Sequence, residues 1–248
     1  MLKYIHGEIY RLLHKKSMYI YFSVLALGYF FLTLVRSSGL STGAIVNDAL
    51  NLFMILSVLT GGFLFSAVYT DDLNAKNLIM LVGFGMSKVK IVLSKFILMT
   101  LSSAVVWVLI PLYICFVHAV MGRPASAEII TTLYTSAMPH FLKIVAFAAV
   151  SGFVVYGSQR PTFSMVAFLL LILGVVSNLL TTAANLEFVN SIAPNFIDHL
   201  MSGIAPRILA GVMVGGSSWL LPLLEYVIYT AAALVLSMLA FLKKEMEF

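Results

Sequence analysis

Charged residues are scarce in this sequence. Only 10% of its 248 residues are Asp, Glu, Lys or Arg, whereas 61% are hydrophobic. Soluble domains carry roughly 25% charged residues. Because so little charge cannot cover a water-facing surface, the composition predicts an integral membrane protein.

Cysteine and histidine are also too sparse to build the usual sites. The lone cysteine, Cys115, excludes a disulfide within the chain. No H-x-x-x-H or H-E-x-x-H motif is present, so no metal site is predicted. The five histidines are spread along the chain: His6, His14, His118, His140 and His199.

The motifs of nucleotide binding and catalysis are absent as well. Residues 83–88 lack the second glycine that a phosphate-binding G-x-x-x-x-G-K-[ST] loop places before its lysine. Ser151-Gly152 lacks the companion glycine of a nucleophile motif, and the adjacent Asp71 and Asp72 are expected to cap the following helix. The chain is therefore expected to bind no cofactor itself and not to be an enzyme.

Long apolar runs dominate the sequence. A helix needs about 20 apolar residues to cross a bilayer, and six segments satisfy this requirement. We therefore predict an all-α membrane protein forming one domain over residues 1–248. The expected spans are 18–35, 50–70, 96–118, 141–157, 163–184 and 218–242.

Three segments outside the spans each predict a distinct structural element. Residues 1–17 place apolar side chains at helical spacing opposite basic ones, which predicts an amphipathic helix on the membrane surface. Residues 71–90 form the longest charged interruption, with Gly83 and Gly85 giving a hinge or turn. Residues 185–217 are expected to hold one or two short re-entrant helices.

The basic residues predict the orientation. Of the 15 lysines and arginines, 11 fall on the side of the N-terminus if six spans are present. Basic residues concentrate on the cytoplasmic side of membrane proteins. Both termini are therefore expected in the cytoplasm, with Lys143 at the outer start of the fourth span.

Polar residues within the spans are candidates for contacts in the membrane. Glu225 lies in the last span, where the transfer of a carboxylate into the membrane costs free energy. Two interpretations stay open: a polar contact in a transport path or a partner for Lys143 or Arg207, and a side chain that simply reaches the interface. Asn178 in the fifth span favours a hydrogen bond between helices.

The order of these features resembles the membrane subunit of a bacterial ATP-binding-cassette (ABC) exporter of the type-2 permease family. Residues 8–16, Glu-Ile-Tyr-Arg-Leu-Leu-His-Lys-Lys, are similar to the interfacial connecting helix of that family. Lys76-Asn77, followed by residues 83–95, is similar to its first cytoplasmic loop, which holds the helix that docks on the ATPase. Lys88 stands where family members often carry arginine.

The resemblance implies further expectations. They are a multi-pass plasma-membrane permease, a second permease copy, separate ATPase subunits that bind ATP and Mg²⁺, and outward movement of an amphipathic or hydrophobic substrate such as an antimicrobial peptide or lipid. The residues implied in ATPase coupling are Asp72, Asn74, Lys76, Asn77, Gly83, Gly85, Ser87 and Lys88.

The substrate path rests on the same analogy and on polar or aromatic residues among aliphatic ones. The expected lining is Phe53, Thr60, Phe65, Asn178, Thr182 and Glu225. Core packing is the competing interpretation for each of them. Three other functions stay open: a six-span substrate-binding subunit of an uptake complex, a membrane-embedded enzyme, and a scaffold for another membrane complex.

Overall fold

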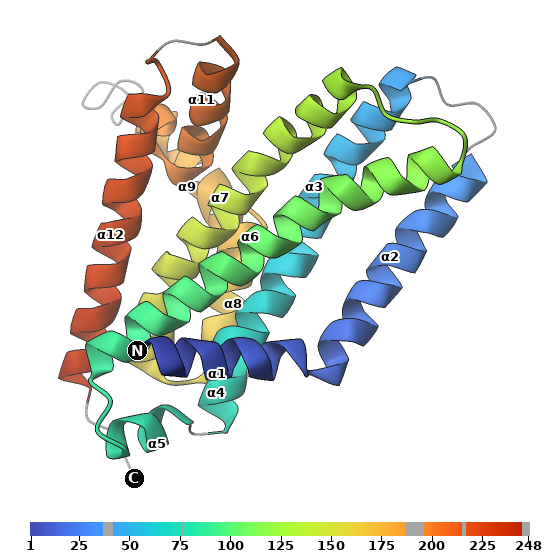
Figure 1. Ribbon diagram of the computed structural model, residues 1–248. Coiled ribbons are helices and arrows are strands. Elements are labelled where there is room, and N and C mark those ends of the chain that lie inside the picture. Colours follow the sequence, from blue (N-terminus) through green and yellow to red (C-terminus); the bar gives the residue numbers. More distant parts are fainter. Residues whose placement is uncertain (37–41, 76, 187–195, 215–216, 245–248) are drawn as a thin grey trace.

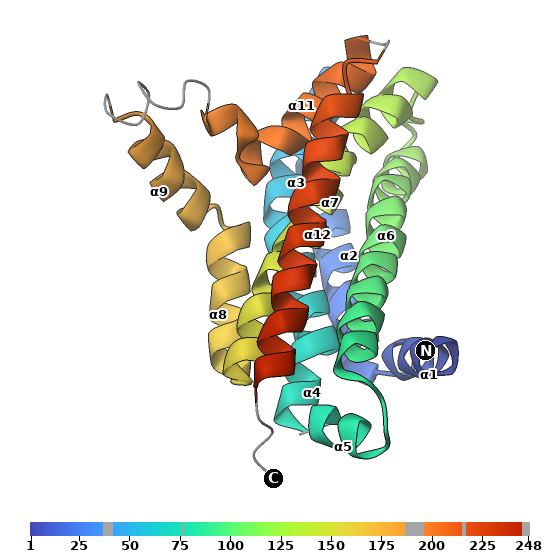
Figure 2. The same ribbon diagram turned by 90° about the vertical axis from the view of Figure 1, so that its left-hand side faces the viewer.

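The computed structural model of the chain is an all-helical bundle, shown in Figures 1 and 2. It describes residues 1–36, 42–75, 77–186, 196–214 and 217–244, and no strand occurs within these ranges. The all-α prediction is confirmed for this part of the chain. In chain order the helices are α1 (Leu2–Leu13), α2 (Lys16–Arg36), α3 (Thr42–Phe65), η1 (Ser66–Thr70), α4 (Asp71–Asn74), α5 (Asn77–Gly83), α6 (Lys88–Val120), α7 (Ala127–Ser158), α8 (Pro161–Ile172), α9 (Val175–Ala184), η2 (Phe196–His199), α11 (Met201–Val214) and α12 (Leu220–Lys243).

Within the described ranges, five helices are long and apolar enough to cross a membrane, or six if α8 and α9 count as one bent span. Such lengths and compositions are those of a membrane-embedded protein. α8 and α9 meet at an angle of 54°. Gly174 supplies the break, because its φ of 79° favours glycine. The fifth predicted span, 163–184, is therefore not one straight helix.

The predicted start of the fourth span is wrong. α7 begins at Ala127 and runs for 32 residues, so Lys143 lies near its midpoint and residues 127–140 are helical. Residues 127–140 fall between the predicted spans 96–118 and 141–157, and several of them are threonines. Here their hydroxyls donate to carbonyls one turn back, as Thr131 does to Ala127 and Thr135 to Thr131, while Ser126 caps the helix.

The second predicted span continues beyond its expected end. α3 passes through the π-helical turn η1 into α4, and the boundary residues Phe65 and Asp71 keep right-handed helical dihedrals. Asp71 and Asp72 are therefore inside a continuing helix, and the prediction that they cap a new one is wrong. Short π-turns like η1 often occur at functional sites.

α7 is the centre of the bundle, packed against α3, α6, α8, α11 and α12. Its contact with α12 is close, because a Cβ added at Gly152 would lie 2.9 Å from the hydroxyl oxygen of Ser237. α2 is the opposite case: only 6% of its spanning window is buried, and it meets α3 and α6 through single side chains, as where Tyr21 stacks on Phe63 and the Tyr113 hydroxyl donates to the carbonyl of Ala26.

The two ends of the bundle differ in what they carry. One end, which we call the α1 end, holds α1, α4, α5 and the last turn of α12 (Figure 2). The opposite end, the α11 end, holds α11 and the start of α12. Residues 185–217 thus contain a short helix, as expected, although 187–195 and 215–216 lie outside the described residues.

Candidate functional site

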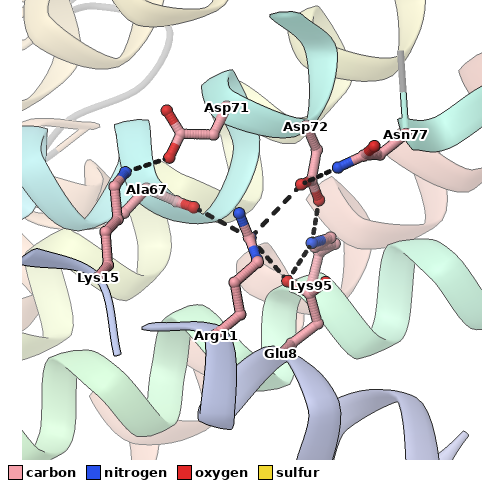
Figure 3. A network of polar contacts seen from close by, with 8 residues as sticks. All are labelled: Glu8, Arg11, Lys15, Ala67, Asp71, Asp72, Asn77 and Lys95. Carbon is pink, nitrogen blue, oxygen red and sulfur yellow. Dashed lines mark hydrogen bonds and ion pairs between the residues drawn. The ribbon is translucent and has the colours of Figure 1, made fainter. Parts of the chain in front are cut away.

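Acidic and basic side chains from three distant parts of the chain meet at the α1 end (Figure 3). We call this group the α1-end network. It consists of Glu8, Arg11, Lys15, Asp71, Asp72, Asn77 and Lys95. Three carboxylates face three cations, so the charges of the network balance.

Lys95 is the centre of the network. It lies in α6 and forms ion pairs with Asp72 of α4 and, over 2.8 Å, with Glu8 of α1. The side chains of Lys95 and Asp72 are only 1% and 2% exposed. A buried charge is tolerated when it is paired with an opposite charge, and here one lysine forms ion pairs with two carboxylates on different helices.

Arg11 makes the second link between α1 and the end of the α3 helix. Its guanidinium donates to Glu8 over 2.7 Å and to the carbonyl oxygen of Ala67 in η1 over 3.3 Å, and lies 3.4 Å from a carboxylate oxygen of Asp72. Lys15 adds an ion pair with Asp71. The second half of α1 and the turn after it are therefore held to η1 and α4 by charged groups.

Asn77, the first residue of α5, connects the network to the next helix. Its amide donates to Asp72 over 3.1 Å. Asp72 thus touches groups from α1, α5 and α6, since it also contacts Arg11 and Lys95. A movement of α5 would therefore act directly on the Asp72 carboxylate through the hydrogen bond from Asn77.

The network changes the acidity of the α1 side chains. Burial alone would raise the pKa of Glu8, but Lys95 and Arg11 more than offset it and leave that pKa below the ordinary value of 4.5. Burial raises the pKa of Tyr4 to about 12, although Lys95 opposes the shift from 5.4 Å above its ring. Glu8 is therefore ionised, and Tyr4 neutral, at neutral pH.

Next to the network, α5 and the turn that follows it form an exposed tip. Phe84 is 87% exposed, and Met80 on α5 is also exposed. A Cβ added at Gly83 or Gly85 would meet no other atom within 4 Å, and Gly85 has a φ of 83°. We call Met80, Gly83, Phe84 and Gly85 the α5 tip; it projects beyond α1 in Figure 2.

Four of the eight residues implied in coupling lie in these two places. Asp72 and Asn77 belong to the network, whereas Gly83 and Gly85 are in the α5 tip. Asn74 is exposed at the end of α4, and Lys76 lies outside the described residues.

Ser87 and Lys88 have structural partners. The Ser87 hydroxyl accepts from the backbone of Lys90 and caps α6. The Lys88 ammonium donates to the carbonyl of Lys244 over 2.8 Å and lies 5.4 Å above the ring of Phe241. A cation at this place stabilises the C-terminal end of α12.

The residues expected to line a substrate path are not brought together. Phe53, Thr60 and Phe65 are buried in the core, where Phe65 stacks on Phe168. Asn178 and Thr182 lie on α9, where both are exposed. They therefore do not form one surface within the described chain.

Glu225 belongs to a third group, at the α11 end. It contacts Arg207 over 3.1 Å and His199 over 3.3 Å, and Arg207 also donates to the carbonyl of Asp198. We call His199, Arg207 and Glu225 the α11-end cluster. Of the two proposed partners of Glu225, the structure selects Arg207. Lys143 instead lies 5.8 Å from the ring of Phe147.

Sequence reasoning missed the roles of Lys95 and Arg11 in the network. Neither residue was expected to pair with Asp72. The sequence does carry one signal, a lysine one to two turns inside an apolar helix, which needs a carboxylate partner. Nothing in the spacing identifies that partner as Asp72, 23 positions earlier in the chain.

No protein-family model matches the chain, and no curated protein matches it. Among the described residues, no group of three histidine, cysteine or acidic side chains could hold a metal ion.

Proposed function

We propose that this chain is the membrane-spanning permease subunit of an ABC transporter, which moves an amphipathic or hydrophobic substrate outward and is driven by separate ATPase subunits. The resemblance of residues 8–16 and 76–95 supports this proposal. So does a bundle with up to six membrane-crossing helices. In this proposal the α1 end faces the cytoplasm of a bacterial cell, α1 lies along the membrane surface, and a second permease copy completes the transporter.

The observation that carries the proposal is the α5 tip. Phe84 is a large apolar side chain that is 87% exposed, in the turn after α5, the helix whose first residue, Asn77, belongs to the α1-end network. Met80 on α5 is exposed as well, and exposed apolar side chains that adjoin one another mark contact sites for proteins or membranes. We assign the α5 tip as the part that docks on the ATPase.

The α1-end network would then carry the movement into the membrane. A force on α5 reaches Asp72 through Asn77, and Asp72 is joined to α6 by Lys95 and to α1 by Arg11. α4 itself continues the helix of α3. Docking at one small tip would therefore act on three helices at once, with Asp72 as a structural link inside the protein.

Affinity purification tests the proposal. The tagged chain is isolated from its native membrane in mild detergent, and co-purifying proteins are identified and assayed for ATP hydrolysis. We expect an ATPase to accompany the parent chain and to be lost with Phe84→Asp, because a charge replaces the exposed apolar contact. Met213→Asp, at another exposed apolar position but at the α11 end, is the matched control and should keep the ATPase.

Two results would overturn this assignment. If the parent chain brings no ATPase, the permease function fails. If Phe84→Asp retains the ATPase as well as Met213→Asp does, the docking surface is elsewhere. Tight binding of one small solute by the chain alone would instead favour a substrate-binding subunit of an uptake complex.

A further inference from the structure

α1 lies on the flank of the bundle and has an inner and an outer face. It runs beside α6 and across the direction of the long helices (Figures 1 and 2). Ile5 and Leu12 are buried on its inner face. Helical spacing places Lys3, Tyr10 and His14 on the opposite face, and all three side chains are exposed. The outer face of α1 is therefore free to contact something outside this chain.

The basic residues of this segment divide between the two faces. Arg11 and Lys15 pair with carboxylates of the α1-end network. Lys3 and Lys16 are exposed, and neither forms an ion pair with any side chain that the structure describes. The inner charges are thus balanced within the protein, whereas the outer charges are not.

No acidic group on the neighbouring elements offsets these two lysines. On α1, α4, α5 and the first turns of α2 and α6, the acidic side chains are Glu8, Asp71 and Asp72, and all three belong to the α1-end network. None of the three is exposed. An anionic partner that approaches the outer face of α1 would therefore meet positive charge without repulsion from these elements.

The corner between α1 and α2 adds exposed apolar and aromatic groups to this charge. Leu13 is exposed at the end of α1, and Tyr19 and Ile20 are exposed near the start of α2. The hydroxyl of Tyr19 donates to the carbonyl of Leu13, which ties the two helices together across the corner. Lysine and tyrosine beside apolar side chains are typical of the zone where lipid headgroups meet hydrocarbon.

α2 indicates the depth of this corner in the membrane. Its spanning window begins at Lys16, and only 6% of that window is buried in the protein. Its exposed apolar side chains therefore face lipid from Tyr19 onward, and Lys16 lies at the level of the headgroups. Because α1 runs across the direction of the long helices, Lys3 at its other end lies near the same membrane surface.

We propose that this surface binds the headgroups of anionic phospholipids such as phosphatidylglycerol. The lipid-binding face, as we call it, comprises Lys3, Tyr10, Leu13, Lys16 and Tyr19. The two lysines pair with lipid phosphates, and the other three side chains contact the boundary between headgroups and acyl chains. A soluble anion would leave those three side chains uncovered. The inference rests on the surface position of α1 in the proposed function and on no other part of it.

The chain offers a suitable place for a probe. Its only cysteine is Cys115, and a Cβ added at Gly7 of α1 would meet no other atom within 4 Å. A donor dye is attached to Gly7→Cys in Cys115→Ala protein, which is reconstituted in phosphatidylcholine vesicles at low ionic strength. Energy transfer is then measured to one acyl-chain acceptor dye, carried either by phosphatidylglycerol or by phosphatidylcholine at the same low fraction.

We expect phosphatidylglycerol to be enriched around the donor over phosphatidylcholine. One lysine near an anionic lipid contributes about fivefold in affinity, so the enrichment should be of at least this order. It should fall as salt is added, because ions screen exposed charges. Lys3→Gln combined with Lys16→Gln should remove most of it. Lys90→Gln combined with Lys243→Gln removes two exposed lysines elsewhere at the α1 end and should leave it unchanged.

Equal transfer to the two lipids would overturn the proposal, and that comparison needs no lysine variant. The proposal also fails if the Lys3 and Lys16 variant keeps the enrichment, or if the Lys90 and Lys243 variant loses as much of it. Equal transfer to both lipids, with loss of a co-purifying ATPase in the Lys3 and Lys16 variant, would assign this face to a protein partner. Because the vesicles contain no ATPase, failure of lipid binding is distinguishable from failure of the permease function.

Discussion

The two ends of the bundle both carry ion pairs, but in opposite settings. At the α1 end, Lys95 and Asp72 are 1% and 2% exposed and join helices that are distant in the chain. At the α11 end, Arg207 and Glu225 are 34% and 26% exposed and join the neighbouring helices α11 and α12. The same chemistry is therefore placed once inside the protein and once near its surface.

Burial decides what each group can do. An exposed ion pair adds little to the free energy of unfolding, because water screens the attraction and the two long side chains lose conformational entropy. A buried pair is not strongly stabilising relative to apolar packing, but removal of one partner leaves a charge without compensation. We conclude that the α1-end network fixes which helices stay together, whereas the α11-end cluster adds only a minor contact.

The largest expected effect is that of Lys95→Met. It leaves the buried carboxylate of Asp72 without its lysine, and breaking a buried ion pair costs about 3–5 kcal/mol. We expect a loss of this size in the free energy of unfolding, measured by reversible denaturation in mixed micelles. Lys90→Met, at an exposed position of the same helix, is the control and should change stability by no more than about 0.5 kcal/mol.

If Lys95→Met were as mild as Lys90→Met, the lysine would have no special role in the network. The comparison between the two ends would then lose its basis.

A smaller loss of stability is expected from Glu8→Gln, and this loss should depend on pH. Because the pKa of Glu8 in the folded protein lies below 4.5, its ionised form stabilises the fold above that pH, and this contribution is lost as the pH falls through the lowered pKa. The melting temperature of Glu8→Gln should therefore lie below that of the parent at neutral pH. The difference should narrow below about pH 4.5; a difference that stays constant into acid would contradict the pairing.

The smallest effect is expected at the α11 end. Glu225→Gln removes one charge of a partly exposed pair, while Arg207 keeps its hydrogen bond to the carbonyl of Asp198 over 2.9 Å. The cost should stay below about 1 kcal/mol by the same denaturation measurement. A loss as large as that of Lys95→Met would show that exposure is not what distinguishes the two ends.

Much of the fold could be predicted from the sequence, because long apolar runs identify helices by composition alone. Composition was a poor guide in α7 and at the α8–α9 bend. In residues 127–140 the threonines and Glu128 lowered the apolar content, although their local hydrogen bonds fit a helix. Apolar content is continuous through Gly174, so only its backbone conformation reveals the break.

The candidate site was less predictable. The charged and glycine-rich character of residues 71–90 indicated an exposed element, and the α5 tip lies there. The α1-end network could not be foreseen, because Glu8, Asp72 and Lys95 are separated by many residues and meet only through tertiary packing. Lys88 illustrates the reverse case: a basic residue in the predicted docking loop contacts the end of α12 instead.

Two double-mutant cycles test most directly whether burial separates the two ends. One combines Lys95→Met with Asp72→Asn, and the other combines Arg207→Met with Glu225→Gln, each followed by the free energy of unfolding in mixed micelles. We predict a coupling energy above about 2 kcal/mol for the buried pair and below about 1 kcal/mol for the exposed pair. Equal coupling at both ends, or additive effects of the Lys95 and Asp72 changes, would contradict this prediction.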